Sequence, residues 1–292
     1  MTPSGSWRIR EVAARLRAAG VPSPESDAVS LMALAGGRTV AEVRRADILG
    51  ELPANDVLAR LEGLIQARCE RIPLQHLTGS APFRNLELAV GPGVFIPRPE
   101  TELLVDLVLA ELSEGGRVVD LCTGSGALAL AIKQERPDAV VHAVELDQHA
   151  HAWAERNAAS LGVDIDLRLG RAQESFPELD GTVDVVVSNP PYIPVGMVPV
   201  DPEVRDHDPE VALFGGSDDG LRFPLEVAAR AYALVRPGGV LVMEHADVQG
   251  DILPERLGRS GWVDIVDVPD LAGKPRAVRA RRKPVVDNPH NP

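Results

Sequence analysis

Four residues that follow a hydrophobic run offer chemistry suited to a flat amino group. The run is Val183–Ser188, and Asn189, Pro190, Pro191 and Tyr192 come directly after it. None of the four is a strong acid, base or nucleophile. The side-chain oxygen of Asn189 and the carbonyl of Pro190 can accept the two hydrogens of a planar –NH2 group, and Tyr192 can lie against its face. The alternative is a rigid turn with Tyr192 as packing, which is the better interpretation of a bare Pro-Pro-Tyr. Asn189 and a glycine-rich loop elsewhere in the chain favour the chemical interpretation.

The same stretch predicts where these groups lie. The β-branched residues of Val183–Ser188 suit a buried parallel strand. A strand cannot continue through Pro190 and Pro191, because proline has no N–H to donate to the ladder. The chain therefore leaves the sheet at the carboxyl end of a strand, which is the edge where open α/β sheets bind ligands.

A glycine-rich loop predicts a second part of the same site. Cys122-Thr123-Gly124-Ser125-Gly126 separates a predicted strand from a predicted helix. A strand, a glycine turn and a helix N-terminus are typical of nucleotide sites, and glycines let the backbone approach a ligand closely. Glu145 follows Gly126 by 19 residues, at the end of the next predicted strand. A carboxylate at this position can accept both hydroxyls of a ribose.

Asp120, just before this loop, indicates the kind of ligand. The spacing is not that of a dinucleotide-binding loop, and no lysine follows the last glycine as in a P-loop. A carboxylate beside the loop disfavours a pyrophosphate and suits an ammonium group, such as that of the methionine part of S-adenosylmethionine. The alternative is a buried acid that only caps local N–H groups.

Composition limits the classes of function. The 292 residues are 45% hydrophobic and 25% charged, with room for two domains. A net charge of −13 and an aromatic content of 3% argue against direct nucleic-acid binding. Cys69 and Cys122 lie far apart, so neither a disulfide framework nor a zinc site is expected. No stretch reaches membrane-spanning length. We expect a cytoplasmic protein without a metal.

The elements that position these groups alternate from residue 117 onward, which predicts a parallel sheet with helices on both faces. The last two strands have no clear helix between them, so we expect them to pair antiparallel. Strands are predicted at 117–121, 139–145, 165–169, 183–188, 239–245, 262–268 and 276–282, and helices at 126–135, 148–160, 221–235 and 248–258.

Four regions of the chain are predicted. Residues 1–72 form four helices, with a capping box at Thr39 and Glu42 and with Asn55 as the cap of the last helix. This unit is either a packing domain or a docking surface for a macromolecular substrate. Residues 73–98 form a linker with a β-hairpin, 99–284 form the domain with the predicted site, and 285–292 form a disordered tail.

The glycine loop, the spaced acid and Asn-Pro-Pro-Tyr together resemble class I S-adenosylmethionine-dependent methyltransferases that act on an amino nitrogen of a planar group: adenine N6, cytosine N4 or glutamine N5. Pro73–Gly79, Phe95–Glu102 and Asp208–Leu221 resemble segments of the peptide chain release factor glutamine methyltransferases, the HemK/PrmC family. The similarity runs from about residue 8 to residue 282. It implies an α/β fold with a seven-stranded, mostly parallel Rossmann-like sheet, plus a small all-α N-terminal domain joined by a β-hairpin linker.

The resemblance implies methyl transfer from S-adenosylmethionine to the side-chain N5 of the glutamine in the Gly-Gly-Gln motif of class I peptide chain release factors. S-adenosylhomocysteine is the product, no metal or catalytic acid or base is needed, and a monomer is expected. Asn189, Pro190 and Tyr192 would be catalytic, and Pro191 would join them in binding substrate. The implied cofactor-binding residues are Asp120, Cys122, Thr123, Gly124, Ser125, Gly126, Glu145, Ala172, Asn189 and Phe95.

The chain departs from the family pattern at four positions, and three alternative functions stay open, of which only the inactive scaffold is motivated by departures, those at Cys122 and Arg171. Cys122 replaces a usual glycine and must tolerate the turn, and Arg171 replaces a usual acid near the adenine. Glu145 replaces the commoner aspartate, and His76 replaces a common tyrosine, more as a hydrogen-bonded linker residue than as a functional one. The alternatives are a glutamine methyltransferase of a ribosomal protein, a DNA or RNA adenine-N6 methyltransferase supported only by the basic stretch 276–283, and a cofactor-binding scaffold without activity.

Overall fold

The computed structural model describes residues 7–284, so the predicted tail at 285–292 lies outside the described residues. The chain forms two compact units. One consists of the residues up to Ser80 together with Pro199–His207, and the other of Ala81–Val198 together with the residues from Asp208 onward. The segment Pro199–His207, which follows Asn189–Tyr192 closely in sequence, is therefore part of the helical unit.

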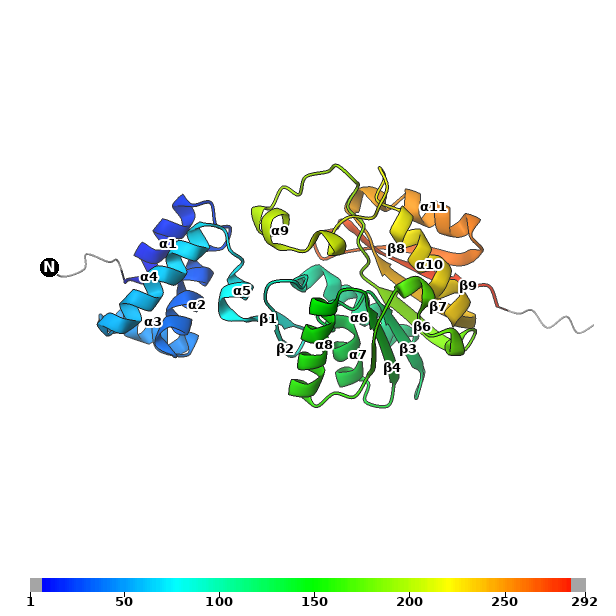
Figure 1. Cartoon of the computed structure of the whole chain (residues 1–292), viewed down its shortest axis with the longest axis horizontal. Helices are drawn as coiled ribbons and strands as arrows, with labels where there is room; N and C mark the ends of the chain where they lie inside the picture. Colours follow the sequence, from blue (N-terminus) through cyan, green and yellow to red (C-terminus); the bar gives the residue numbers. More distant parts are fainter. Residues whose placement is uncertain (1–6, 285–292) are drawn as a thin grey trace, which may run out of the picture. The chain divides into compact units, whose positions relative to one another are not determined.

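The helical unit packs around a core that includes Val12, Leu16, Leu31 and Ile65. The capping box is confirmed, because Thr39 N–H donates to Glu42 and Glu42 N–H donates to the Thr39 hydroxyl. The prediction that Asn55 caps the last of these helices is wrong, because Asn55 is the first helical residue and Ala54 occupies the N-cap position. The helices are α1 Ile9–Ala18, α2 Pro24–Gly36, α3 Val40–Leu49, α4 Asn55–Cys69 and α5 Leu74–Thr78, with α9 Pro202–His207 from the later segment (Figure 1).

A buried ion cluster holds α9 in this unit. Arg68 Nε donates to Asp27 Oδ2 at 2.8 Å, and Arg68 Nη1 lies 2.7 Å from Glu203 Oε1. Arg71 Nε also donates to Glu203 Oε1, at 2.8 Å. Burial works to raise the pKa of Glu203, but the hydrogen bonds from Arg71, Asp201 and Arg68 outweigh burial and lower this pKa to about 2. No local sequence pattern predicted this cluster.

The predicted β-hairpin is confirmed as a two-stranded sheet of β1 Ser80–Phe83 and β2 Leu86–Ala89, and all of its residues except Ser80 belong to the second unit. Phe83, Leu86 and Leu88 are buried in the core. Helix α6, Glu102–Glu111, follows the Phe95–Glu102 stretch.

The main sheet has seven strands in the order β5-β4-β3-β6-β7-β9-β8. β3 is parallel to β4 and β6, β4 to β5, and β6 to β7, whereas β9 is antiparallel to both β7 and β8. The predicted seven strands and the antiparallel final pair are confirmed. β7 starts earlier than predicted because Val235 pairs with Val183 across an irregularity. The strands are β3 Arg117–Leu121, β4 Val140–Glu145, β5 Asp166–Leu169, β6 Val183–Ser188, β7 Val235–Glu244, β8 Trp262–Pro269 and β9 Pro275–Arg282.

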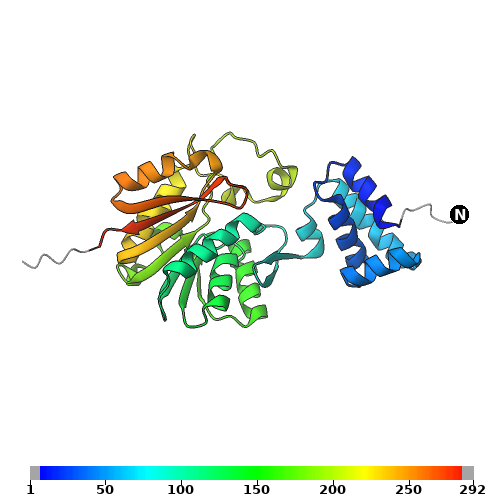
Figure 2. The ribbon, with the colours of Figure 1, turned by 180° about the vertical axis from the view of Figure 1, so that it is seen from behind.

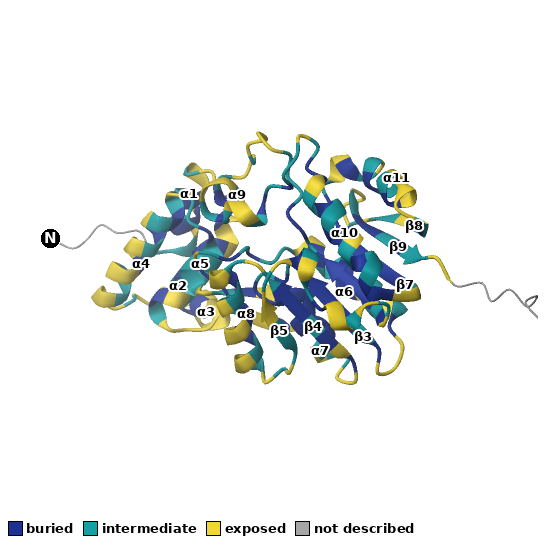
Figure 3. Cartoon of the chain, turned by 45° about the vertical axis from the view of Figure 1, so that its right-hand side comes forward, coloured by how far each residue is buried: buried dark blue, intermediate teal, exposed yellow. Residues whose placement is uncertain are grey.

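Helices cover both faces of this sheet, as Figures 1 and 2 show from opposite sides. Alternate strand residues face opposite ways: Val118 and Val185 join the core cluster of α6 and α7, and Val119 and Val186 join that of α10 and α11. The central strands are therefore buried on both faces (Figure 3). The helices are α7 Ala127–Glu135, α8 Gln148–Leu161, α10 Arg222–Leu234 and α11 Ile252–Arg259.

Among the helices of residues 7–284, none combines the length and the apolar character needed to cross a membrane.

Candidate functional site

The strand order places the two predicted parts of the site at one edge of the sheet. The order reverses between β3 and β6, because the chain runs from β3 outward to β5 and then returns to the other side of β3. Leu121 pairs with Ser188, and Ser188 pairs with Met243. The loops after β3 and β6 and the end of β7 therefore emerge side by side, at the switch point where ligands bind in such sheets.

Backbone hydrogen bonds hold the glycine loop. The N–H groups of Cys122 and Thr123 donate to the carbonyl of Val144 at 3.1 and 3.0 Å. Gly124 N–H donates to Glu145 Oε2 at 2.8 Å. Burial raises the pKa of Glu145, while its hydrogen bonds with backbone N–H groups oppose the change. Glu145 thus ties the loop to the end of β4, a role that its spacing alone did not predict.

The two glycines of this loop have different steric surroundings. Both have a positive φ, 58° at Gly124 and 85° at Gly126. A Cβ on Gly126 would meet Leu130 Cδ1 at 2.9 Å, whereas a Cβ on Gly124 would meet nothing within 4 Å. A side chain at Gly126 would therefore displace Leu130, whereas Gly124 borders open space at the N-terminal end of α7.

Asp120 is fully buried beside the loop. Its Oδ2 accepts from the Thr123 hydroxyl at 2.5 Å and from Ala129 N–H at 3.2 Å. Its Oδ1 has no hydrogen-bond partner among the described residues. Burial raises the pKa of Asp120 to about 7. Local capping thus accounts for one oxygen only, and the other is buried without a hydrogen-bond partner among the described residues.

Cys122 has a φ of 67°, the left-handed conformation that glycine adopts most easily. The sequence-based expectation that a cysteine must tolerate this turn is confirmed. Burial raises the pKa of its thiol well above the ordinary value, so the side chain stays a neutral thiol.

A hydrogen-bonded network surrounds Asn189 and Tyr192. Asn189 Nδ2 donates to Thr101 Oγ1 at 3.2 Å, and the Thr101 hydroxyl donates to Glu244 Oε2 at 2.7 Å. The Tyr192 hydroxyl donates to Glu244 Oε1 at 3.0 Å. Thr101 and Glu244 are only 4% and 2% exposed, and Pro190 is also buried. The Glu244 carboxylate therefore bonds directly to Tyr192 at one end of the Asn-Pro-Pro-Tyr motif and connects through Thr101 to Asn189 at the other.

Sequence reasoning missed Thr101 and Glu244. Thr101 lies inside the Phe95–Glu102 stretch, but nothing singled it out. Glu244 did carry a signal, because it is an acid at the end of the buried run Val240–Met243, on the same sheet edge as Asn189.

The Asp208–Leu221 stretch lies against the segment that follows Asn189. Ile193 N–H donates to the Leu213 carbonyl at 2.8 Å, and Gly215 N–H donates to the Ile193 carbonyl at 2.9 Å. Arg98 Nη2 lies 2.8 Å from Asp208 Oδ2. Three separated stretches of sequence thus meet around the Asn-Pro-Pro-Tyr motif.

The other predicted residues lie outside this network. Phe95 is half-buried, with the Arg98 guanidinium 5.1 Å from its ring centroid. Ala172 is buried in the same core cluster as Leu121 and Val144. The Arg171 side chain is mostly exposed, and His76 lies edge-on to His207 in the helical unit.

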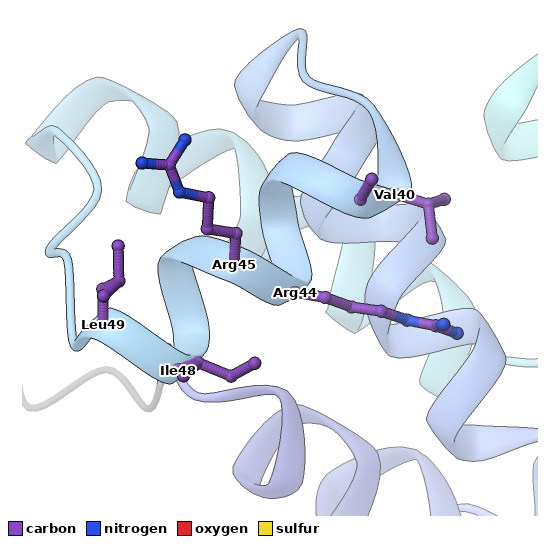
Figure 4. A pocket seen from close by; sticks show the side chains of 6 residues that line it. Val40, Arg44, Arg45, Ile48 and Leu49 are labelled. Carbon is purple, nitrogen blue, oxygen red and sulfur yellow. The ribbon is translucent and has the colours of Figure 1, made fainter.

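The helical unit carries a hollow of about 690 Å³ along α3. Its lining side chains project from one helix (Figure 4), and Ile48 and Leu49 are 82% and 59% exposed. The lining residues are Val40, Ala41, Arg44, Arg45, Ile48 and Leu49.

Comparisons with known proteins agree with this architecture. The Methyltransferase small domain family matches residues 85–197, and the PrmC N-terminal domain family matches residues 9–79. A release factor glutamine methyltransferase of Streptomyces coelicolor is 50% identical over 280 residues, which cover 94% of this chain and 96% of the relative. One of Bifidobacterium longum is 44% identical, over 92% of this chain and 96% of the relative.

This chain belongs to the release factor glutamine methyltransferases. The enzyme's fold is also similar to that of a crystallised methyltransferase from Pyrococcus furiosus, with a TM-score of 0.52 and 19% identity. That similarity covers 75% of the enzyme and 98% of the other chain. At this identity it concerns the fold alone.

Proposed function

We propose that this enzyme transfers a methyl group from S-adenosylmethionine to the side-chain N5 of the glutamine in the Gly-Gly-Gln motif of class I peptide chain release factors. The observation that carries the proposal is the orientation of Asn189. Its Nδ2 donates to Thr101, so Oδ1 is the end left to accept a hydrogen bond from a target amide. Family membership supports the choice of substrate.

The residues of the glycine loop fit the cofactor. Cys122–Gly126 and Glu145 would hold its nucleoside, since Gly124 borders open space. Asp120 would hold its ammonium group, because a buried carboxyl oxygen beside the loop lacks a partner. Phe95, Ala172 and Asn189 would complete the pocket. When bound, S-adenosylmethionine supplies an electrophilic methyl group on a positively charged sulfur, and we propose no metal.

Asn189 and Pro190 would promote methyl transfer by holding the side-chain nitrogen of the target glutamine in place. An amide nitrogen is a poor nucleophile because its lone pair is delocalised. The Asn189 oxygen and the Pro190 carbonyl would accept its two N–H groups and hold the nitrogen at near-attack distance. The rings of Pro190 and Pro191 fix φ and so keep this carbonyl in place.

No residue of this network needs to act as an acid or a base. Both oxygens of Glu244 already accept hydrogen bonds, from Thr101 and Tyr192. Burial raises the pKa of Tyr192, so its hydroxyl stays protonated and shapes the slot for the planar amide. The target nitrogen becomes acidic only as the new bond forms, and its proton leaves late.

We propose that residues 1–72 dock the release factor through the α3 hollow. Its exposed Ile48 and Leu49 are typical of a protein contact. Arg44 and Arg45 add positive charge in a chain of net charge −13, which suits an acidic patch on the partner. We also propose that the enzyme acts as a cytoplasmic monomer, without direct nucleic-acid contact.

A methylation assay with three substrates tests the proposal. The full-length enzyme is incubated with labelled S-adenosylmethionine and, in turn, with release factor, ribosomes and DNA, and mass spectrometry locates the methyl group. We expect it on the Gly-Gly-Gln glutamine. A methyl group on a ribosomal glutamine or on adenine would support the corresponding rival enzyme. Cofactor binding without any transfer would indicate an inactive scaffold.

A further inference from the structure

Asn189 has two side-chain ends of nearly the same shape but opposite function. The oxygen accepts hydrogen bonds, and the –NH2 group donates them. Only the oxygen can receive an N–H from a target amide, so an inverted Asn189 would face the target with donors. Under the proposed function, the enzyme needs a device that fixes this side chain in one orientation.

The Thr101 hydroxyl forms a hydrogen bond with Asn189, but a hydroxyl alone does not select one orientation of the Asn189 side chain. It can either accept from Nδ2 or donate to Oδ1. Glu244 removes this freedom, because an ionised carboxylate only accepts. The Thr101 proton points to Glu244 Oε2 at 2.7 Å, so Thr101 has only lone pairs to offer Asn189 Nδ2, which lies 3.2 Å away.

We propose that Thr101 and Glu244 are positioning residues that hold the Asn189 oxygen toward the target glutamine, and this inference rests on the proposed function. The network is protected from water, since Thr101 and Glu244 are almost completely buried. Its members come from three separate elements: Thr101 from the turn before α6, Glu244 from the end of β7, and Asn189 from the loop after β6. The second oxygen of Glu244 fixes Tyr192 at the other end of the motif.

The orientation of Asn189 by Thr101 requires Glu244 to be ionised. Burial raises the pKa of Glu244, the hydrogen bonds from Thr101 and Tyr192 oppose this, and the charges of Arg276 and Glu100 act on it in opposite directions. A protonated Glu244 can donate to Thr101, which frees the Thr101 proton to donate to the Asn189 oxygen. The orienting effect is present above this pKa and is lost as the pH falls through it.

Thr101→Val is the primary test, because valine matches threonine in shape but lacks the hydroxyl. We expect single-turnover methyl transfer to release factor at saturating cofactor to fall roughly tenfold to a hundredfold, the equivalent of one or two hydrogen bonds. The Kd for cofactor by calorimetry should change less. Thr101→Ser should restore most of the rate. Thr182→Val, which removes an exposed hydroxyl elsewhere in the same unit, is the matched control and should keep the wild-type rate.

Glu244→Gln provides a second test if Thr101→Val does not fold. Glutamine can present either an oxygen or an –NH2 group to Thr101, so methyl transfer by the Glu244→Gln variant should be slower than in the wild type. The pH profile of this variant should also lack the acid limb that Glu244 gives the wild type. A Thr101→Val rate equal to wild type, or an acid limb that is unchanged in Glu244→Gln, would overturn the inference.

The NMR signal of the Asn189 side-chain amide separates this inference from the proposed function, because it does not depend on turnover. We expect Nδ2 protons protected from exchange in the wild type and unprotected in Thr101→Val. If protection differs between the two proteins in this way but the wild type leaves release factor unmethylated, the positioning role is supported and the proposed function is refuted. Equal protection in both proteins refutes the positioning.

Discussion

Replacing Asn189 by aspartate keeps the shape of the side chain but turns its donating end into an acceptor. In the structure that end is Nδ2, which donates to Thr101 Oγ1 at 3.2 Å. An aspartate oxygen in that position would face Thr101 Oγ1. The single proton of this hydroxyl is already donated to Glu244 Oε2, which lies 2.7 Å from Oγ1. The Thr101 proton can serve only one of the two carboxylates, so one of them loses a partner.

The size of the effect follows from these contacts. An unsatisfied buried acceptor costs about 1–3 kcal/mol, and a second negative charge near Glu244 adds repulsion or forces one acid to take up a proton. Asn189→Ala loses one preorganised contact with the target amide, worth about 3 kcal/mol or roughly a hundredfold in rate. If acceptance alone mattered, aspartate would retain more activity than alanine. Because the structure uses the amide N–H as well, we expect Asn189→Asp to be as poor as Asn189→Ala.

The assay is single-turnover methyl transfer to release factor at saturating cofactor, with the modified residue located by mass spectrometry. Calorimetry of cofactor binding is the control, and the Kd should change less than the rate in both variants. An aspartate variant close to the wild-type rate would refute the role of the Thr101 bond. An undiminished rate in Asn189→Ala, or methyl on a residue other than glutamine, would refute the mechanism.

Four further predictions follow from individual sites. Gly124→Val should abolish cofactor binding by calorimetry without changing far-UV circular dichroism, because its side chain would enter the open space over the loop and its β-branched Cβ would strain the local φ of 58°. Cys122→Val should lower the free energy of unfolding by about 1–3 kcal/mol, because a β-branched residue strains a φ of 67°, whereas Cys122→Gly should be tolerated in the same denaturation assay. Glu203→Ala should lower the free energy of unfolding by roughly 3 kcal/mol, whereas Glu51→Ala, at an exposed ion pair, should lower it by less than about 1 kcal/mol. The pKa of Glu203 is lowered from 4.5 to about 2. The stabilisation by Glu203 is therefore complete above pH 4.5 and is lost as the pH falls toward 2. Ile48→Asp should raise the KM for intact release factor but not for a short Gly-Gly-Gln peptide, and Leu271→Asp, at an even more exposed apolar residue, should change neither KM.

Local patterns in the sequence were sufficient to predict the fold and much of the candidate site. β-branched runs such as Val183–Ser188 were identified as strands because a strand buried on both faces needs an almost continuous apolar run. Pro190 and Pro191 marked the end of that strand, and the glycines at 124 and 126 marked the turn after another. In each case the physical cause acts within a few residues, so the sequence contains it.

Only the tertiary structure determined how these parts are held together. Thr101 and Glu244 are 143 residues apart and Asn189 and Thr101 are 88 apart, and they meet because β6 and β7 are neighbours and α6 packs beside them. Glu203 likewise joins the helical unit through an arginine 132 residues away. The direction of a hydrogen bond depends on what every partner can donate or accept, and those partners are set by strand order and packing. The sequence therefore singled out Asn189 as a candidate site residue, and the folded chain decided which end of its side chain bonds to Thr101.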